Sequence, residues 1–191
     1  MASQIGYYDT LKSVAGKVFT YLASIIITGT DGKTLTVMDD TTVGGAAVNP
    51  TLPAFLAYQT ANQQDNVTGD GTFVDALFNT EVFDLAANFT GGVFTAPVTG
   101  KYRLTANVNL AGTAANHTLI IISLVTSNRT YSVYDKFSVA IERVMHINAL
   151  CDMDAGDTAK ISIYAGPSGS KVVDIVGSAN GDTYFCGELV C

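Results

Sequence analysis

Three aspartates near the end of an alternating segment are the carboxylates whose spacing could hold a metal ion. Asp152, Asp154 and Asp157 lie close together in the sequence, with Gly156 before the last of them. Carboxylate oxygens at the tip of a turn are ligands that Ca²⁺ prefers. The twelve-residue calcium loop with its terminal glutamate is missing, so we expect solvated turn acids and keep calcium as the weaker alternative.

The histidines and cysteines do not form a catalytic pattern. His117 and His146 are far apart, no Ser-His-Asp arrangement accompanies them, and two distant histidines do not supply the His and Glu cluster of a jelly-roll metalloenzyme. We expect both to be surface or interface residues. The chain has an odd number of cysteines, Cys151, Cys186 and Cys191, and they lack CxxC spacing. This predicts free thiols that are buried or terminal. We therefore expect neither an enzyme nor a cofactor.

The composition favours self-association. The chain has 191 residues, 48% hydrophobic and only 14% charged, against a typical charged share of about 25%. No run reaches the roughly 20 apolar residues of a membrane helix, so we expect apolar surface buried between subunits and no membrane insertion. The net charge of −7 argues against nucleic acid. The apolar run at residues 18–27 begins late and lacks a cleavage site, so no secretory signal is expected.

The clearest strand pattern begins at Tyr102. From Tyr102 to Leu110, apolar and polar residues alternate without error, as in a strand with one buried and one exposed face. Pro97 and Gly100 precede it and predict a tight turn. Phe94 to Ala96 is then the end of the preceding strand, which gives the stretch the appearance of a hairpin.

The remaining sequence pattern of residues 51–191 predicts an all-β domain. Short apolar segments recur between polar turns, which is typical of an antiparallel sandwich or jelly roll. Phe78 and Phe83 are expected as bulky core anchors, residues 62–71 as a polar loop, and residues 119–125, LIIISLV, as a strand covered on both sides.

Residues 1–50 have a different composition and predict an anchoring or oligomerisation segment. Its boundary is placed in the Gly-rich stretch at residues 39–52. A helical apolar stripe contains the anchoring candidates Leu11, Val14, Val18 and Ile25. The competing interpretation is a strand from Ile25 onward, followed by a β-hairpin through Asp31-Gly32.

Several spaced residues resemble the signature of the globular head of complement component 1q. The phrase Gly92-Val93-Phe94-Thr95-Ala96-Pro97 is the most characteristic part, and Gly100-Lys101-Tyr102 follows it. Two further matches are the turn Asp154–Thr158 and the closing Phe185-Cys186-Gly187-Glu188-Leu189. The resemblance covers about residues 53–191. The gap between Phe89 and Phe94 is shorter than in the family, which predicts a tighter turn there.

The resemblance implies a ten-strand jelly roll of the tumour-necrosis-factor type and a tight homotrimer with an apolar threefold axis. Trimers of this family use the fold as a recognition head. The residues expected in the core or at the trimer contact are Phe94, Tyr102, Leu104, Phe185 and Leu189.

The segment SIIITGTDGKTLTV, which begins at Ser24, resembles short β segments of bacteriophage tail-fibre and other virion proteins. We therefore predict a homotrimeric structural protein of a phage virion. It would be a capsid-decoration, head-fibre or tail-fibre protein that contacts other virion proteins through its N-terminus. The alternative is a secreted complement-1q-like ligand-binding protein. Tyr131 and Tyr134 are the candidates for stacking on a host-surface glycan.

Overall fold

The computed structural model describes residues 24–28, 34–38, 52–60, 64–137 and 142–191. These residues form strands and no helix. Contacts divide the chain into two compact units, Met1–Val48 and Asn49–Cys191. The described part of the first unit is one antiparallel pair, β1 (Ser24–Thr28) with β2 (Thr34–Met38). Ile25 therefore belongs to a strand, whereas the predicted stripe residues Leu11, Val14 and Val18 lie outside the described residues.

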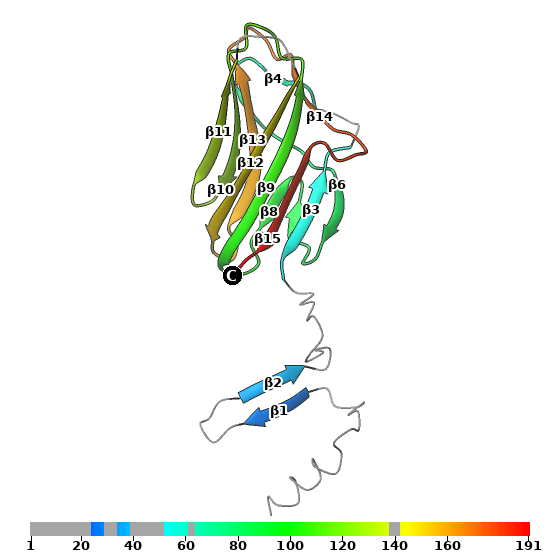
Figure 1. The fold of residues 1–191 in the computed structure, drawn as a ribbon, viewed down its shortest axis with the longest axis vertical. Helices are drawn as coiled ribbons and strands as arrows, with labels where there is room; N and C mark the ends of the chain where they lie inside the picture. Colours follow the sequence, from blue (N-terminus) through cyan, green and yellow to red (C-terminus); the bar gives the residue numbers. More distant parts are fainter. Residues whose placement is uncertain (1–23, 29–33, 39–51, 61–63, 138–141) are drawn as a thin grey trace, which may run out of the picture. The chain divides into compact units, whose positions relative to one another are not determined.

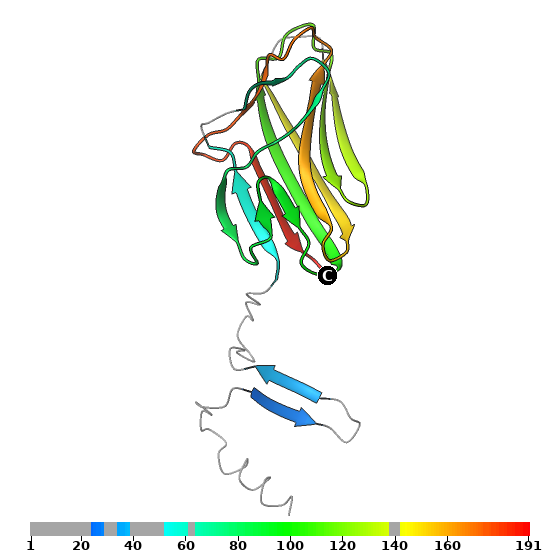
Figure 2. The ribbon, with the colours of Figure 1, turned by 180° about the vertical axis from the view of Figure 1, so that it is seen from behind.

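The second unit, called the head below, is a sandwich of two antiparallel sheets (Figures 1 and 2). The seven-stranded sheet contains β3 (Ala54–Tyr58), β4 (Gln64–Thr68), β6 (Thr80–Asp84), β9 (Gly100–Ala111), β12 (Arg143–Met153), β14 (Val173–Val176) and β15 (Tyr184–Leu189). The six-stranded sheet contains β5 (Phe73–Asp75), β7 (Phe89–Thr90), β8 (Val93–Thr95), β10 (Leu119–Thr126), β11 (Thr130–Lys136) and β13 (Thr158–Gly166). The predicted all-β jelly-roll sandwich is confirmed, with several short strands beyond the ten expected.

Strand β9 pairs with three strands of the seven-stranded sheet. The order of the sheet is β4-β14-β9-β15-β3-β6, and β12 pairs with the other edge of β9. The pairing with β12 is continuous from Gly100 to Leu110. The predicted alternation is observed, because Tyr102, Leu104 and Ala106 are all fully buried and the residues between them face outward.

The segment before β9 joins the two sheets and does not form a hairpin with it. Strand β8 pairs with β13 and β7 in the other sheet. The turn at residues 97–99 crosses the sandwich, and the Tyr102 hydroxyl donates to the carbonyl of Val98 at 2.8 Å. The rings of Phe94 and Tyr102 consequently meet from opposite sheets, with centroids 5.3 Å apart.

The turn between β7 and β8 is as tight as the short spacing predicts. Gly91 and Gly92 connect Thr90 directly to Val93, and both have φ > 0, at 60° and 84°. Two-residue hairpins of this kind favour glycine at such angles.

An aromatic cluster fills the core between the sheets. The Phe55 ring stacks on Phe89 and Phe94 at centroid distances of 4.7 and 4.8 Å, and the edge of Phe185 completes the cluster. Gly187 makes room for it, since a Cβ there would lie 2.7 Å from the Phe55 ring. This steric need explains the glycine in the closing Phe-x-Gly-x-Leu phrase.

Two sequence expectations about the head are wrong, and a third holds in part. The polar loop at residues 62–71 contains β4, which pairs with β14. Phe83 is 42% exposed, because it lies opposite Leu56 on the outward side of β3, whereas Phe78 is buried. The expectation for residues 119–125 holds in part, because the inward side of β10 is fully buried, while on its outward side Ser123 is buried and Ile121 and Val125 are half-buried.

Candidate functional site

The outward side of the seven-stranded sheet is the broadest candidate surface, and we call it the β9 face. The strand register arranges its side chains in rows that cross the sheet. One row runs from β12 to β3 through His146, Asn107, Tyr184 and Tyr58. The next row contains Asn148, Thr105, Cys186, Leu56 and Phe83. Neither row contains a carboxylate, a lysine or an arginine.

On β12, β9, β15 and β3, the charges of the β9 face are confined to its other rows and are paired. Arg103 and Glu188 are neighbours in the register and form an ion pair of 3.2 Å. Lys101 and Asp152 form a second pair. All four side chains are about half exposed, so each pair contributes little to stability. These four strands therefore turn almost no net charge outward, although the chain has a net charge of −7, and Asp174 adds a carboxylate at the end of the face formed by β14.

Large apolar side chains are exposed on the same face. Val144 and Leu150 of β12 are 62% and 57% exposed, and Val82 of β6 is 59% exposed. Leu150 stands directly opposite Arg103. Exposed apolar groups that recur over one face are typical of a surface that another protein covers.

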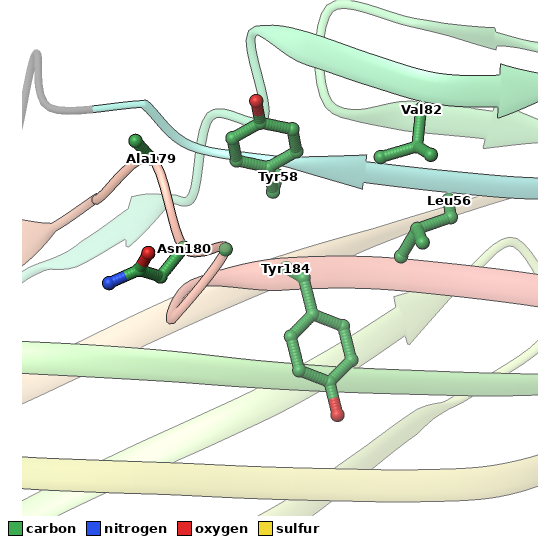
Figure 3. Close-up of a pocket in the computed structure, with 7 residues that line it drawn as sticks. Leu56, Tyr58, Val82, Ala179, Asn180 and Tyr184 are labelled. Carbon is green, nitrogen blue, oxygen red and sulfur yellow. The ribbon is translucent and has the colours of Figure 1, made fainter.

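A hollow of about 510 Å³ lies at one end of the β9 face (Figure 3). Leu56, Tyr58 and Val82 line it from β3 and β6, Tyr184 lines it from β15, and the loop at residues 179–181 closes one side. A second hollow of about 240 Å³ surrounds Cys186 and Thr105. Such hollows can receive side chains of another protein, which a flat sheet surface cannot do.

The two tyrosines predicted to stack on a sugar differ in their surroundings. Tyr131 is half-buried and packs against the core. Burial raises its pKa, and the neighbouring Cys151 adds to the rise. Tyr134 is 63% exposed, because it alternates with Tyr131 across β11 and faces away from the core. Of these two tyrosines, only Tyr134 offers a ring face to a ligand.

The three candidate calcium ligands have protein partners. Asp157 Oδ2 accepts hydrogen bonds from the backbone N–H of Asp154 at 2.8 Å and from Asn128 Nδ2 at 2.6 Å. Asp152 pairs with Lys101. Within the described ranges, no three His, Cys, Asp or Glu side chains gather as a metal site would require. Calcium binding stays a prediction from spacing, without added support from the geometry.

One histidine expectation is wrong. His117 is fully buried and not at the surface, because its Nδ1 accepts the backbone N–H of Ala114 at 2.8 Å and so closes the loop before β10. His146 faces outward on β12, as predicted, beside Asn148.

The three cysteines are free. Cys151 is buried in the core, and burial raises the pKa of its thiol. Burial also raises the pKa of the Cys186 thiol, and the nearby Glu188 carboxylate adds to the rise. A raised pKa keeps a thiol protonated and poorly nucleophilic.

The remaining predicted residues belong to the core of the head. Phe94, Tyr102, Leu104 and Phe185 are fully buried, and Leu189 packs against them. They support the β9 face from below. The outward residues Tyr58, Val82 and Tyr184 were not among the predicted site residues. The alternation of β3 and β15 was the available signal for two of them.

No family model matches the chain, and no curated protein matches it. Solved structures do match. The globular domain of zebrafish complement 1qA is 20% identical, with a TM-score of 0.52, over 73% of this chain and 98% of that domain. Murine APRIL at pH 8.5 is 13% identical, with a TM-score of 0.49, over 73% of this chain and 99% of its own. The zebrafish domain establishes that the head shares the complement-1q fold. None of the described segments is a helix of the length and apolarity needed to cross a membrane.

Proposed function

We propose that this chain is a homotrimeric, non-catalytic recognition protein of a bacteriophage virion, and that its subunits associate through the β9 face. The observation that supports this most directly is the combination on one face of exposed aliphatic side chains, two hollows and self-cancelling charges. Copies of a chain with net charge −7 repel one another least where each presents a neutral surface.

The fold supports a trimer further. The resemblance to complement component 1q implies a homotrimer whose sheets meet around an apolar threefold axis. Leu150 on β12 and Leu56 on β3 stand outward on the sheet that would face this axis. The three subunits would cover these side chains and fill the hollow beside Tyr184.

The assignment to a virion is based on the first unit. The fibre-like segment forms the antiparallel pair β1 and β2, and its sequence resembles virion proteins. We propose that residues 1–50 anchor the protein to capsid or tail proteins and that the head at residues 51–191 projects from the particle for decoration or host attachment.

Mass measurement tests the assembly. Light scattering on the full chain at micromolar concentration should give about 60 kDa, three times the 20.0 kDa of one chain. A mass near 20 kDa would exclude the trimer. Repeating the measurement at high salt serves as a control, because an apolar interface should persist when charges are screened.

Deleting residues 1–50 tests the anchor. The truncated protein should keep the trimeric mass and fail to co-purify with phage particles, whereas the full chain should band with them. Co-purification of the truncated protein would contradict the anchoring role. A trimer that never associates with particles would favour the alternative, a secreted complement-1q-like ligand-binding protein.

A further inference from the structure

The outward side of the six-stranded sheet, called the β10 face, has a polar ladder that the proposed assembly does not use. In the register, Ser132 of β11, Ser123 of β10, Ser162 of β13 and Asp75 of β5 lie side by side in one row. Four adjacent strands span roughly 14 Å at about 4.8 Å per step. The small serines leave a groove of about 420 Å³, within the usual size of small-ligand sites. We call it the serine groove.

An aromatic row forms one flank of the serine groove. The register places Tyr134, Ile121, Tyr164 and Phe73 next to the serine row. Tyr134 and Phe73, at its two ends, are 63% and 56% exposed. The Phe73 and Tyr164 rings contact each other at a centroid distance of 5.2 Å, which holds Phe73 in place. A ligand in the groove therefore meets aromatic surface beside the serine row, of which Ser132 is the accessible member.

Hydrogen bonds within the protein orient the hydroxyls of the serine row. Ser123 and Ser132 share a hydrogen bond of 2.9 Å, and Ser162 Oγ donates to the carbonyl of Val74 at 3.2 Å. Ser123 and Ser162 are buried and form the floor of the groove, whereas Ser132 is half-buried. Because a hydroxyl has one donor and two acceptor positions, Ser132 retains hydrogen-bonding positions for a ligand.

The charge in the groove excludes strongly charged ligands. Lys160 Nζ and Asp75 Oδ2 form an ion pair of 2.6 Å, so the two charges cancel. The ammonium retains two N–H donors and the carboxylate retains acceptor positions. A phosphate or a free carboxylate would meet Asp75, and a cation would compete with Lys160.

We propose that the serine groove binds a neutral carbohydrate. A pyranose ring has an apolar C–H face, which suits the rings of Tyr134 and Phe73, and an edge of hydroxyls that both donate and accept, which suits the Ser132 hydroxyl together with the Lys160 ammonium and the Asp75 carboxylate. A second copy of the chain is a poorer occupant, because the groove is narrow, is bordered by the Lys160–Asp75 ion pair and lacks the broad apolar surface of the β9 face. This inference depends on the proposed recognition role for its biological meaning, and it names the ligand class and the site.

The test uses the full chain and an array of neutral oligosaccharides built from hexoses, hexosamines, deoxyhexoses and pentoses, with sialylated and sulfated glycans as charged comparators. We expect binding to at least one neutral glycan. Saturation-transfer NMR with that glycan should report contact through its C–H protons. No binding to any neutral glycan, or binding to charged glycans alone, would overturn the proposal.

Variants locate the site. Tyr134→Ala should weaken binding about tenfold, in line with the loss of one aromatic platform, and Ser132→Leu should abolish it by filling the groove. The matched control is Val133→Ala, which lies on the same strand, faces the other way and is also exposed. Unchanged binding in both groove variants, with melting temperatures equal to the parent, would place the sugar elsewhere and refute the assignment. The mass of each sample separates this result from the proposed function: a trimer that binds no glycan refutes only the groove, and a glycan-binding monomer refutes only the assembly.

Discussion

The two outer faces of the sandwich share one core and differ in what their strands turn outward. On the β9 face, the rows across the sheet combine amide, threonine, tyrosine and aliphatic side chains, with Leu56 and Leu150 among them. On the β10 face, serines form one row and aromatic residues the next. Because the inward residues of both sheets serve the same core, the outward residues are free to select different partners. On this difference we base the two proposals, protein association for one face and a small polar ligand for the other.

The largest expected effect comes from a charge on the β9 face. Leu150→Asp would place three carboxylates near the threefold axis of the proposed trimer, where repulsion and desolvation oppose association. We expect the mass to fall from about 60 kDa to that of the 20.0 kDa chain. The matched substitution Tyr134→Asp on the β10 face should leave the trimer intact. Dissociation by both variants, or by neither, would remove the distinction between the faces.

Truncation of phenylalanines on the two sides of β3 and β6 should separate core from surface. Phe55 is 1% exposed and stacks on two rings, so Phe55→Ala should lower the free energy of unfolding by about 3–5 kcal/mol. Phe83 faces outward, and Phe83→Ala should cost about 0.5 kcal/mol or less in a monomeric background such as Leu150→Asp. Urea unfolding measures both. Equal losses would mean that Phe83 packs in the core after all.

Substitution of Gly187 should destabilise the head more than substitution of an exposed glycine. A Cβ at Gly187 would lie 2.4 Å from Leu104 Cδ2 and 2.7 Å from Phe55 Cε1, so Gly187→Ala should destabilise the head by about 1–3 kcal/mol. Gly169 has no neighbour within 4 Å of its would-be Cβ, and Gly169→Ala is the control with little effect. Thermal melting would compare them, and a neutral Gly187→Ala would show that the core adapts.

Tyr102 should make the head sensitive to alkaline pH. Burial raises its pKa in the folded state, so its stabilising contribution is complete below the unfolded pKa of about 10 and is lost as the pH rises through the higher folded value. The free energy of unfolding should therefore decline above about pH 10, and less steeply in Tyr102→Phe. Near pH 7 that variant should lose about 1 kcal/mol with its hydrogen bond to Val98. If the free energy of unfolding declined equally steeply above about pH 10 in the parent and in Tyr102→Phe, this role of Tyr102 would be contradicted.

The smallest effects should come from the ion pairs, one on each face. Glu188→Gln breaks the pair with Arg103, and Asp75→Asn breaks the pair with Lys160. Because all four side chains are about half exposed, each variant should change the free energy of unfolding of the monomeric head by about 0.2–1 kcal/mol. In the proposed trimer, Glu188→Gln should lower the stability more than Asp75→Asn does, because association would desolvate Arg103. If both variants lower the stability of the trimer by the same small amount, Arg103 lies outside the interface.

Much of the fold could be predicted from local pattern. The alternation after Tyr102 and the spacing from Phe89 to Phe94 depend on neighbours in the sequence, and the observed strand and two-residue turn agree with them. Phe83 and His117 were misplaced because burial depends on what packs from elsewhere. A bulge in the pairing of β3 with β6 accompanies Phe83 on the outward side, and a loop closes over His117.

By itself, the sequence determined the class of the domain, the inward face of its central strand and the low charge that favours association, because periodicity and composition are local properties. Only the tertiary structure decided which outward residues share a surface. Ser132, Ser123, Ser162 and Asp75 come from four strands, and their row exists because antiparallel register aligns them. The same register brings Tyr58 beside Tyr184 and Leu56 beside Cys186. Pairing between distant strands is set by the packing of the whole core, and for that reason no local pattern could predict either face.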